Sequence, residues 1–338
     1  MTAQAPKLPP SVGNPLPTSP LSASAAAHGL RERKLQKQKK TKKVKCEHEE
    51  GGTYIANPVK MFDHIVVHPV AWPAEALRWM GVPRRLPVTP PTATRPLPEA
   101  VMSAALRQTY DHIANTLKGG HKASREDLAN LVLEAFVSIA DVQKVNIYRR
   151  AKAYLSLGDM RVRLEPLHGF SGSGVAPVLA YVDEPHRRQQ RARLFCAHAT
   201  RHECEQAQQI DDEVAVLDVA MLLAYAQEHK RWGVPPDSAG NHTTRVMYPN
   251  DDGNAMIVLT AVTPAETLVG IQEGNDTLKR IKFSRRTVNI FSTADAGEWE
   301  SSPLLQFVWS LVEEAGKLAV KTPAPRWPIG PWAWTTHF

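Results

Sequence analysis

The stretch RERKLQKQKKTKKVK, residues 31–45, is dense in side chains that bind phosphate. It holds nine lysines and arginines beside a single acid, Glu32. Such runs bind polyanions by displacing condensed counterions and need no fixed fold, and this one has no aromatic side chain on which a base could stack. It therefore predicts sequence-independent binding to RNA, although a solubilising tail or a nuclear import signal, KKTKKVK, fits the same residues. The predicted phosphate contacts are Arg31, Arg33, Lys34, Lys37, Lys39, Lys40, Lys42, Lys43 and Lys45.

Two further basic clusters lie in the rest of the chain. PHRRQQRARL places Arg187, Arg188 and Arg191 early in a predicted helix, and LKRIKFSRR, residues 278–286, carries five cations around a predicted strand end. Either cluster could extend a polyanion-binding surface. Pairing with neighbouring carboxylates explains both at least as well, and the three arginines are kept as candidate RNA contacts.

The stretch CAHATRHEC, residues 196–204, contains residue types that bind zinc. On a helix, which turns about 100° per residue, the two cysteines lie on a different face from His198 and His202, so the four cannot share one metal. His198, His202 and Glu205 do share a face, but the usual Cys-x2-Cys spacing is missing. We expect no metal site and no other cofactor.

Catalytic patterns are equally incomplete. HGFSGSG, residues 168–174, approaches a G-x-S-x-G nucleophile elbow, but Ser173 stands where the closing glycine should be. A flexible turn is the better interpretation. The acid pairs at residues 211–212 and 313–314 have no histidine or metal partner in the pattern. The sequence thus predicts no catalytic residue and a protein that is not an enzyme.

Charge is divided unevenly along the 338 residues. Residues 1–45 hold ten basic residues and one acid, whereas the other 293 hold 31 basic residues against 33 acids. The net charge of +7 therefore belongs to the N-terminal arm, and the body is close to neutral. Three cysteines suggest a reducing compartment rather than a disulfide framework.

Nothing in the hydropathy pattern predicts a membrane partner. The longest apolar run, VAVLDVAMLLAYA at residues 214–226, falls short of the roughly 18 residues that a span needs and carries Asp218. The first 30 residues lack the continuous apolar segment of a signal peptide. We expect a soluble protein.

The N-terminal elements have little periodicity. Residues 1–50, rich in Pro, Ala and Ser and then in Lys and Arg, have no periodic apolar face and predict a disordered arm. Residues 51–98 mix aromatic anchors with many prolines and predict an extended strap laid over another surface.

Residues 99–232 predict a helical shell domain. Apolar spacing indicates a helix that ends at Gly119-Gly120, a second from the cap Ser124 to about Leu157, and two more within residues 186–231. Between them, we expect a glycine-rich bend at residues 169–174 and a short strand at residues 178–182.

The period changes in the C-terminal part. Residues 244–293 predict an antiparallel β region built from two hairpins, RVMYPNDDGNAMIVLTAV and TLVGIQEGNDTLKRIKF, and the strand RTVNIFS. The cap pair Ser302-Pro303 opens a helix over residues 300–320. The fold class is therefore α+β, with a mainly helical body, an antiparallel sheet in the C-terminal half and a disordered basic N-terminal arm.

Residues 321–338 form an aromatic tail. Aromatic side chains in a proline-rich segment are unfavourable in water, so the tail should dock on its own body or on a neighbouring copy. The predicted subunit contacts are Trp327, Trp332, Trp334 and Phe338.

This layout of basic arm, proline-rich strap, near-neutral body and aromatic tail resembles the coat proteins of small non-enveloped RNA viruses. A largely helical body of this size is similar to the capsid subunits of the partitivirus-like double-stranded RNA viruses. The resemblance concerns the layout of the whole chain and includes no diagnostic motif. It implies a homo-oligomeric shell that encloses genomic RNA, in the virion and the host cytoplasm, or in the nucleus if the basic run is an import signal.

A different class of protein fits the same arm. A cellular RNA-associated protein, bound to ribosomes or in the nucleus, could insert the arm into folded RNA. The two classes differ in self-association, because a shell protein forms large particles and a ribosomal or nuclear factor stays small without its RNA.

Overall fold

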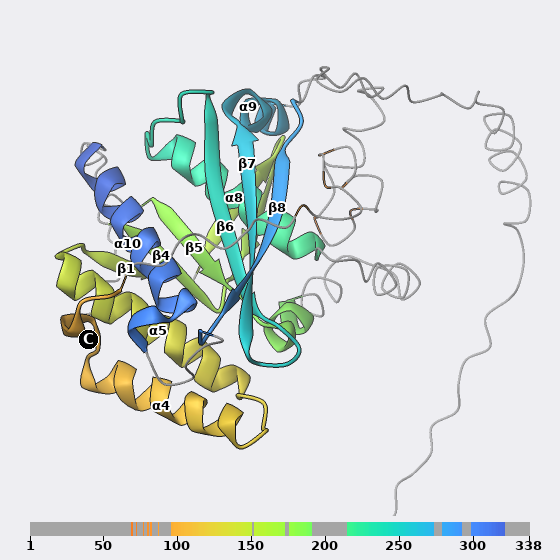
Figure 1. The fold of residues 1–338 in the computed structure, drawn as a ribbon. Helices are drawn as coiled ribbons and strands as arrows, with labels where there is room; N and C mark the ends of the chain where they lie inside the picture. The colour runs from red at the N-terminus through yellow and green to blue at the C-terminus, as the bar shows by residue number, and fades with distance from the viewer. Residues whose placement is uncertain are drawn as a thin grey trace, which may run out of the picture. The chain divides into compact units, whose positions relative to one another are not determined.

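The structure is a computed structural model, shown in Figure 1. It describes residues 96–150, 152–172, 176–190, 215–273, 279–292 and 299–321, together with six single positions between 69 and 87. The N-terminal arm, most of the proline-rich strap and the aromatic tail lie outside the described residues.

A mixed six-stranded sheet is the centre of the fold, with strand order β1-β4-β5-β6-β7-β8. Neighbouring strands are antiparallel except β5 and β6, which pair in parallel through Ala180 with Val246 and Tyr181 with Met247. The strands are β1 (Ile147–Arg150), β4 (His168–Gly172), β5 (Pro177–Tyr181), β6 (Asn241–Pro249), β7 (Ala255–Pro264) and β8 (Lys282–Asn289).

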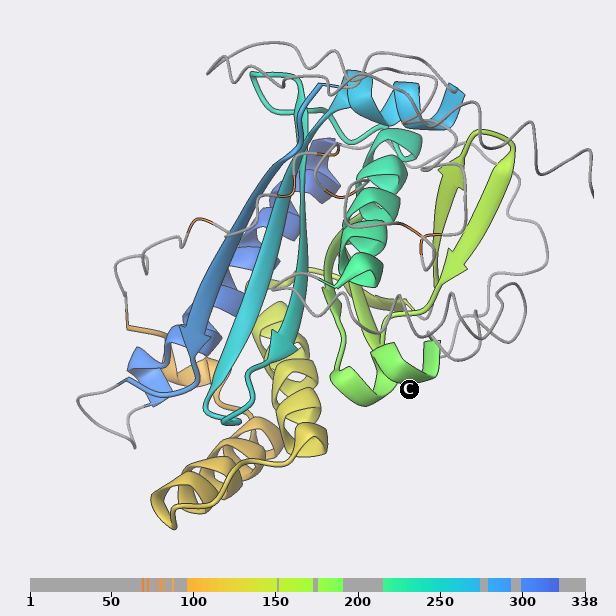
Figure 2. The same ribbon diagram turned by 90° about the vertical axis from the view of Figure 1, so that its right-hand side faces the viewer.

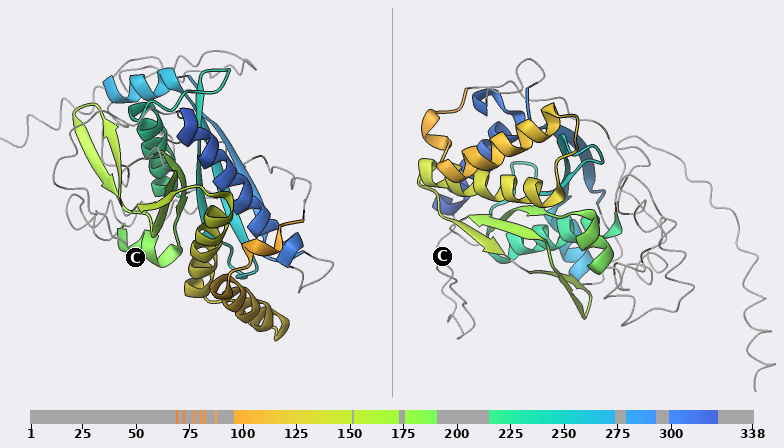
Figure 3. Two further views of the ribbon diagram at one scale, coloured as in Figure 1. Left: turned by 90° about the vertical axis from the view of Figure 1, so that its left-hand side faces the viewer. Right: turned by 90° about the horizontal axis from the view of Figure 1, so that it is seen from below.

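Each face of this sheet is covered by its own layer, and each layer has its own apolar core. On one face lie α4 (Ala104–Lys118), α5 (Arg125–Gln143) and α10 (Pro303–Lys321) (Figures 1 and 3). On the other lie α8 (Val216–Arg231), α9 (Ala265–Glu273) and a separate hairpin of β2 (Ala153–Leu157) and β3 (Met160–Leu164). Figure 2 shows α8 between the large sheet and this hairpin.

Strand alternation explains why two cores form. Along β6, Val246 faces the α8 core and Met247 faces the α5 core, and their β7 partners Leu259 and Val258 do the same. Since successive side chains of a strand point to opposite faces, a strand buried on both sides is apolar at nearly every position. The α+β class predicted from the sequence is thus confirmed.

The predicted helix starts are confirmed by their caps. The Oγ of Ser124 accepts a hydrogen bond from the Asp127 amide at 3.0 Å, and the Oγ of Ser302 accepts one from the Leu305 amide at 3.3 Å. An N-terminal cap of this kind satisfies an amide that has no partner inside the helix.

The second helix is shorter than predicted. It ends at Gln143, because Lys144 adopts a left-handed conformation with φ of 55° and the Val145 amide turns back to the Ala140 carbonyl. A lysine rarely adopts this conformation, so the sequence carries no stop signal there. Strands β1 and β2 follow where we expected the helix to continue, and β3 lies between that expected helix and the expected bend.

Two further predictions are wrong in detail. The expected bend at GFSGSG begins as strand β4, whose five residues are all buried. In the β region, the segment expected to begin the second hairpin is the helix α9, so residues 244–293 contribute three strands to a mixed sheet rather than a separate antiparallel one.

Two described positions of the strap, Met80 and Pro87, lie along the outer edge of β8. The Ile281 amide donates to the Met80 carbonyl at 3.2 Å and the Arg285 amide to the Pro87 carbonyl at 3.0 Å. Trp72 is 1% exposed and packs in the α8 core. The strap therefore supplies hydrogen-bond acceptors to an otherwise open sheet edge.

At the opposite edge, the described residues place no strand outside β1. Tyr148 on this strand is 52% exposed. Among the helices of the described ranges, none is long and apolar enough to cross a bilayer.

Candidate functional site

Most of the residues predicted to bind RNA or neighbouring subunits lie outside the described residues. These include all nine cations of the arm, Arg191, and the tail residues Trp327, Trp332, Trp334 and Phe338. The zinc-like stretch at residues 196–204 also lies there. Their predicted roles stay predictions.

Arg187 is a core residue. It is 8% exposed, and its Nε and Nη2 donate to the two carboxylate oxygens of Asp218 at 3.0 and 2.6 Å. Its guanidinium also lies 4.0 Å from the centre of the Tyr248 ring. This bidentate pair joins the segment after β5 to α8, and it leaves the guanidinium inaccessible to a polyanion.

Arg188 points outward instead. Its side chain is 76% exposed, and its Nε donates to the Glu184 carboxylate at 3.0 Å. Exposed pairs of this kind are weak, so a phosphate can compete for this arginine.

The cations around the start of β8 are spread over different environments. Lys279 pairs with Glu266 at 2.8 Å, Arg286 lies 5.6 Å from the Phe307 ring centre, and the exposed Arg280 and Lys282 have no acidic partner among the described residues. Three of the five cations, Lys279, Arg280 and Lys282, are therefore exposed, and Arg285 and Arg286 are half-buried.

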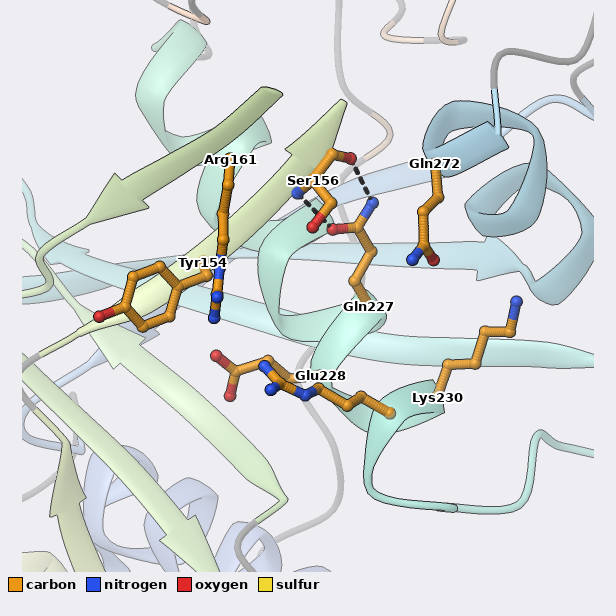
Figure 4. Close-up of a pocket in the computed structure, with 8 residues that line it drawn as sticks. Tyr154, Ser156, Arg161, Gln227, Glu228, Lys230 and Gln272 are labelled. Atoms are coloured by element: carbon orange, nitrogen blue, oxygen red, sulfur yellow. Dashed lines mark hydrogen bonds between the residues drawn. The ribbon is translucent and has the colours of Figure 1, made fainter. Parts of the chain in front are cut away.

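A pocket that no sequence motif predicted lies between the β2–β3 hairpin and the C-terminal turns of α8 (Figure 4). Its volume is about 370 Å³. The lining residues are Tyr154, Ser156, Arg161, Gln227, Glu228, Lys230, Arg231 and Gln272.

The hairpin positions its side chains by alternation. Ala153, Leu155 and Leu157 are buried in the α8 core, so Tyr154 and Ser156 face the other side of the strand. Arg161, opposite Ser156 in the register, places its guanidinium 4.1 Å from the centre of the Tyr154 ring. The turn that sets this register is Gly158-Asp159, with Gly158 at φ of 55°.

Two buried side chains form the inner wall of the pocket. Gln227 accepts from the Ser156 amide and donates to the Ser156 carbonyl, both at 2.8 Å, so it binds β2 as a neighbouring strand would. Glu228 is 4% exposed and pairs with Arg150 of β1. The arginine neutralises the single carboxylate among the described lining residues.

Three cations of the lining have no carboxylate partner among the described residues: Arg161, Lys230 and Arg231. A basic residue in the last turn of a helix often binds the free carbonyls there. In α8, backbone amides already donate to the carbonyls of Glu228, His229 and Lys230, at 2.9, 2.9 and 3.1 Å. The side chains of Lys230 and Arg231 are therefore not needed as hydrogen-bond donors to those carbonyls.

Beside this pocket, a pair of buried histidines joins α8 to the sheet. His229 bonds the Pro177 carbonyl through Nε2, and its ring meets that of His242 edge-on at 5.9 Å. Burial lowers the pKa of His229 to about 4, although the bond to Pro177 opposes the shift. Burial also lowers the pKa of His168 to about 4, with Arg149, whose Nη2 donates to the His168 ring at 2.7 Å, adding to the effect.

The hydroxyl at the centre of the elbow-like pattern is not presented for catalysis. Ser171 lies within β4 and is 0% exposed. A nucleophile elbow instead exposes its serine on a sharp turn after a strand. Among the described residues, no three His, Cys, Asp or Glu side chains are grouped so that they could hold a metal ion.

The L-G-D-M turn between two alternating runs, residues 153–157 and 160–164, was the signal that could have located the pocket. The contribution of α8 could not be foreseen, because it depends on how the hairpin folds over that helix.

In comparisons with known proteins, no family model matches the chain, and no curated protein matches it by sequence.

Proposed function

We propose that this chain is a structural, self-assembling protein that packages RNA through sequence-independent neutralisation of phosphates by its N-terminal arm. The observation that carries the proposal is the partition of charge. Ten basic residues and one acid lie within residues 1–45, and 31 basic residues are balanced by 33 acids in the remainder. A polycation attached to a near-neutral body can hold RNA without repelling copies of itself.

The body supports the second half of the proposal. The described residues leave the outer edge of β1 unpaired and Tyr148 half exposed beside it, whereas the β8 edge is hydrogen-bonded to the strap. An open strand edge is a ready template for pairing with another chain. The aromatic tail supplies further apolar side chains for subunit contacts.

Neutralising the arm tests the RNA-binding half. Two full-length variants are compared, one with the nine arm cations of residues 31–45 changed to glutamine and one with its seven lysines changed to arginine. The glutamine variant should lose RNA retention, and the arginine variant, which keeps the charge, should retain it. For the unmodified chain, the logarithm of the RNA affinity should fall with the logarithm of the salt concentration with a slope of about −6, as nine single-strand phosphate contacts predict.

Particle size tests the assembly half. Light scattering after size-exclusion chromatography should give large particles, or at least dimers, for the unmodified chain and also for the glutamine variant. Unchanged RNA content in the glutamine variant would contradict the role of the arm. A chain that stays a small monomer with and without RNA would contradict the shell and favour a cellular RNA-associated protein.

A further inference from the structure

We propose that the pocket between the β2–β3 hairpin and α8 binds the phosphate group of a nucleotide, either free or as a unit of an RNA chain. The pocket belongs to the near-neutral body, so this inference extends the proposed function without depending on the arm. It assigns a phosphate site with a defined shape, in addition to the cations of the arm.

Charge is the first argument. Arg161 from β3 and Lys230 and Arg231 from α8 line the same pocket and have no carboxylate partner among the described residues. The charge of Glu228 is neutralised by Arg150. The pocket thus carries an excess of positive charge, which favours a phosphate dianion over a neutral or cationic ligand.

Orientation is the second argument. The Arg161 guanidinium lies over the Tyr154 ring, with its Cζ 4.1 Å from the ring centre. Stacking of this kind fixes the planar group while its N–H donors remain available at the edge. Gln227, bonded to both backbone groups of Ser156, fixes the strand that carries Tyr154. Arg161 is therefore positioned before a ligand arrives.

Size and remaining polar groups are the third argument. A volume of about 370 Å³ lies within the range of small-molecule sites. The oxygen and the nitrogen of the Gln227 amide are both hydrogen-bonded to the backbone of Ser156. The Ser156 hydroxyl and the Gln272 amide have no hydrogen-bond partner among the described residues. These two groups are free to bond the sugar or base attached to the phosphate.

The experiment uses the full chain with the nine arm cations already changed to glutamine, so that the arm contributes nothing. Calorimetric titration measures binding of inorganic phosphate, adenosine 5′-monophosphate, uridine 5′-monophosphate, unphosphorylated adenosine and a ten-nucleotide RNA. In this background, the pocket variant carries Arg161→Gln and Lys230→Gln. The matched control carries Arg163→Gln and Lys279→Gln, since Arg163 is on the same face of β3 but pairs with Glu165, and Lys279 pairs with Glu266.

The phosphorylated ligands should bind and adenosine should not. The pocket variant should weaken their binding at least about tenfold while the control stays within about twofold, because only the former removes cations that face the phosphate. Arg161→Lys keeps the charge but loses the planar guanidinium over Tyr154, so its phosphate binding should lie between that of the unmodified pocket and that of the pocket variant. Thermal unfolding of each variant checks that it is folded.

The same titrations distinguish a free nucleotide from a unit of an RNA chain as the ligand. Binding of single nucleotides assigns a free nucleotide, and binding of the RNA alone, lost in the pocket variant, assigns an RNA unit. Equal binding by the pocket variant and its control would overturn the proposal. So would the absence of any phosphate, nucleotide or RNA binding to the arm-neutral chain, a result that leaves the role of the arm itself unaffected.

Discussion

His229 makes the stability of the fold dependent on pH. Its ordinary pKa of about 6.5 applies in the unfolded chain, and burial lowers it to about 4 in the folded one. Between these values the unfolded chain binds more protons, so the free energy of unfolding increases with pH. The contribution is fully present above pH 6.5 and is lost as the pH falls toward 4.

Denaturant titrations between pH 7.5 and pH 4.5 should therefore show a decrease in the free energy of unfolding, of which about 3 kcal/mol comes from His229. His229→Gln should flatten this dependence, and His168, shifted in the same direction, should leave a residual slope. The exposed His121→Gln is the control and should follow the unmodified chain. Identical slopes for all three proteins would contradict the assignment.

Arg187 and Arg188 show what residue type alone can predict. Both are arginines in the same basic run, and the sequence treats them alike. The fold buries Arg187 against Asp218, whereas Arg188 stays at 76% exposure. Since the partner carboxylate lies 31 residues away on α8, no local pattern could separate a core ion pair from a surface cation.

At the scale of elements, helix α5 depends on its cap. The Ser124 hydroxyl accepts from the Asp127 amide and donates to the Asp127 carboxylate at 2.6 Å. Ser124→Ala should lower the free energy of unfolding by about 1 kcal/mol, because the amide loses its acceptor. Chemical denaturation measures the change.

The matched control is Ser310→Ala. Ser310 is an exposed serine within α10 whose hydroxyl donates to the Phe307 carbonyl. Alanine favours a helix interior, so this change should stay within about 0.5 kcal/mol. Equal losses in the two variants would show that Ser124 is not acting as a cap.

Helix starts and the β6–β7 hairpin were predictable, because caps and the Asn-Asp-Asp-Gly turn are local signals. The elements that were predicted wrongly are those whose local sequence is typical of another structure or whose pairing is long-range. Helix α9 contains Thr267, Leu268 and Val269, a strand-like run, yet it packs Leu268 and Ile271 into the α8 core. The parallel pairing of β5 with β6 brings together residues that lie more than 60 positions apart, which no turn signal encodes.

The candidate pocket also combines elements that have local sequence signals with a long-range contact that has none. The hairpin that carries Tyr154 and Arg161 has a local signal in its Gly-Asp turn, but its first strand was wrongly predicted as the end of a helix that runs to about Leu157. The helical character of α8 was predicted correctly. Their meeting was not, since it depends on Gln227 pairing with the backbone of Ser156, 71 positions earlier.

At the scale of the whole molecule, the aromatic tail is predicted to contribute to assembly. Truncation after Pro325 removes Trp327, Trp332, Trp334 and Phe338. Burial of such side chains at an interface contributes much of its binding energy, so the truncated chain should form smaller particles and melt at a lower temperature. Light scattering and thermal unfolding are measured together.

Serine in place of the three tryptophans and of Phe338, in a chain of full length, separates the loss of aromatic contacts from the loss of length. This variant should match the truncation. If particle size and melting temperature both equal those of the unmodified chain, the tail makes no subunit contact.

The two edges of the large sheet are not equivalent. At the β8 edge, backbone amides donate to carbonyls of the strap, and at the β1 edge the described residues supply no such acceptor. If two copies pair through β1, both use the same sheet edge, and the result is a dimer with a two-fold axis. Such pairing makes a continuous sheet across two subunits, and the strap carbonyls that already accept from the amides of Ile281 and Arg285 oppose its extension through the β8 edge.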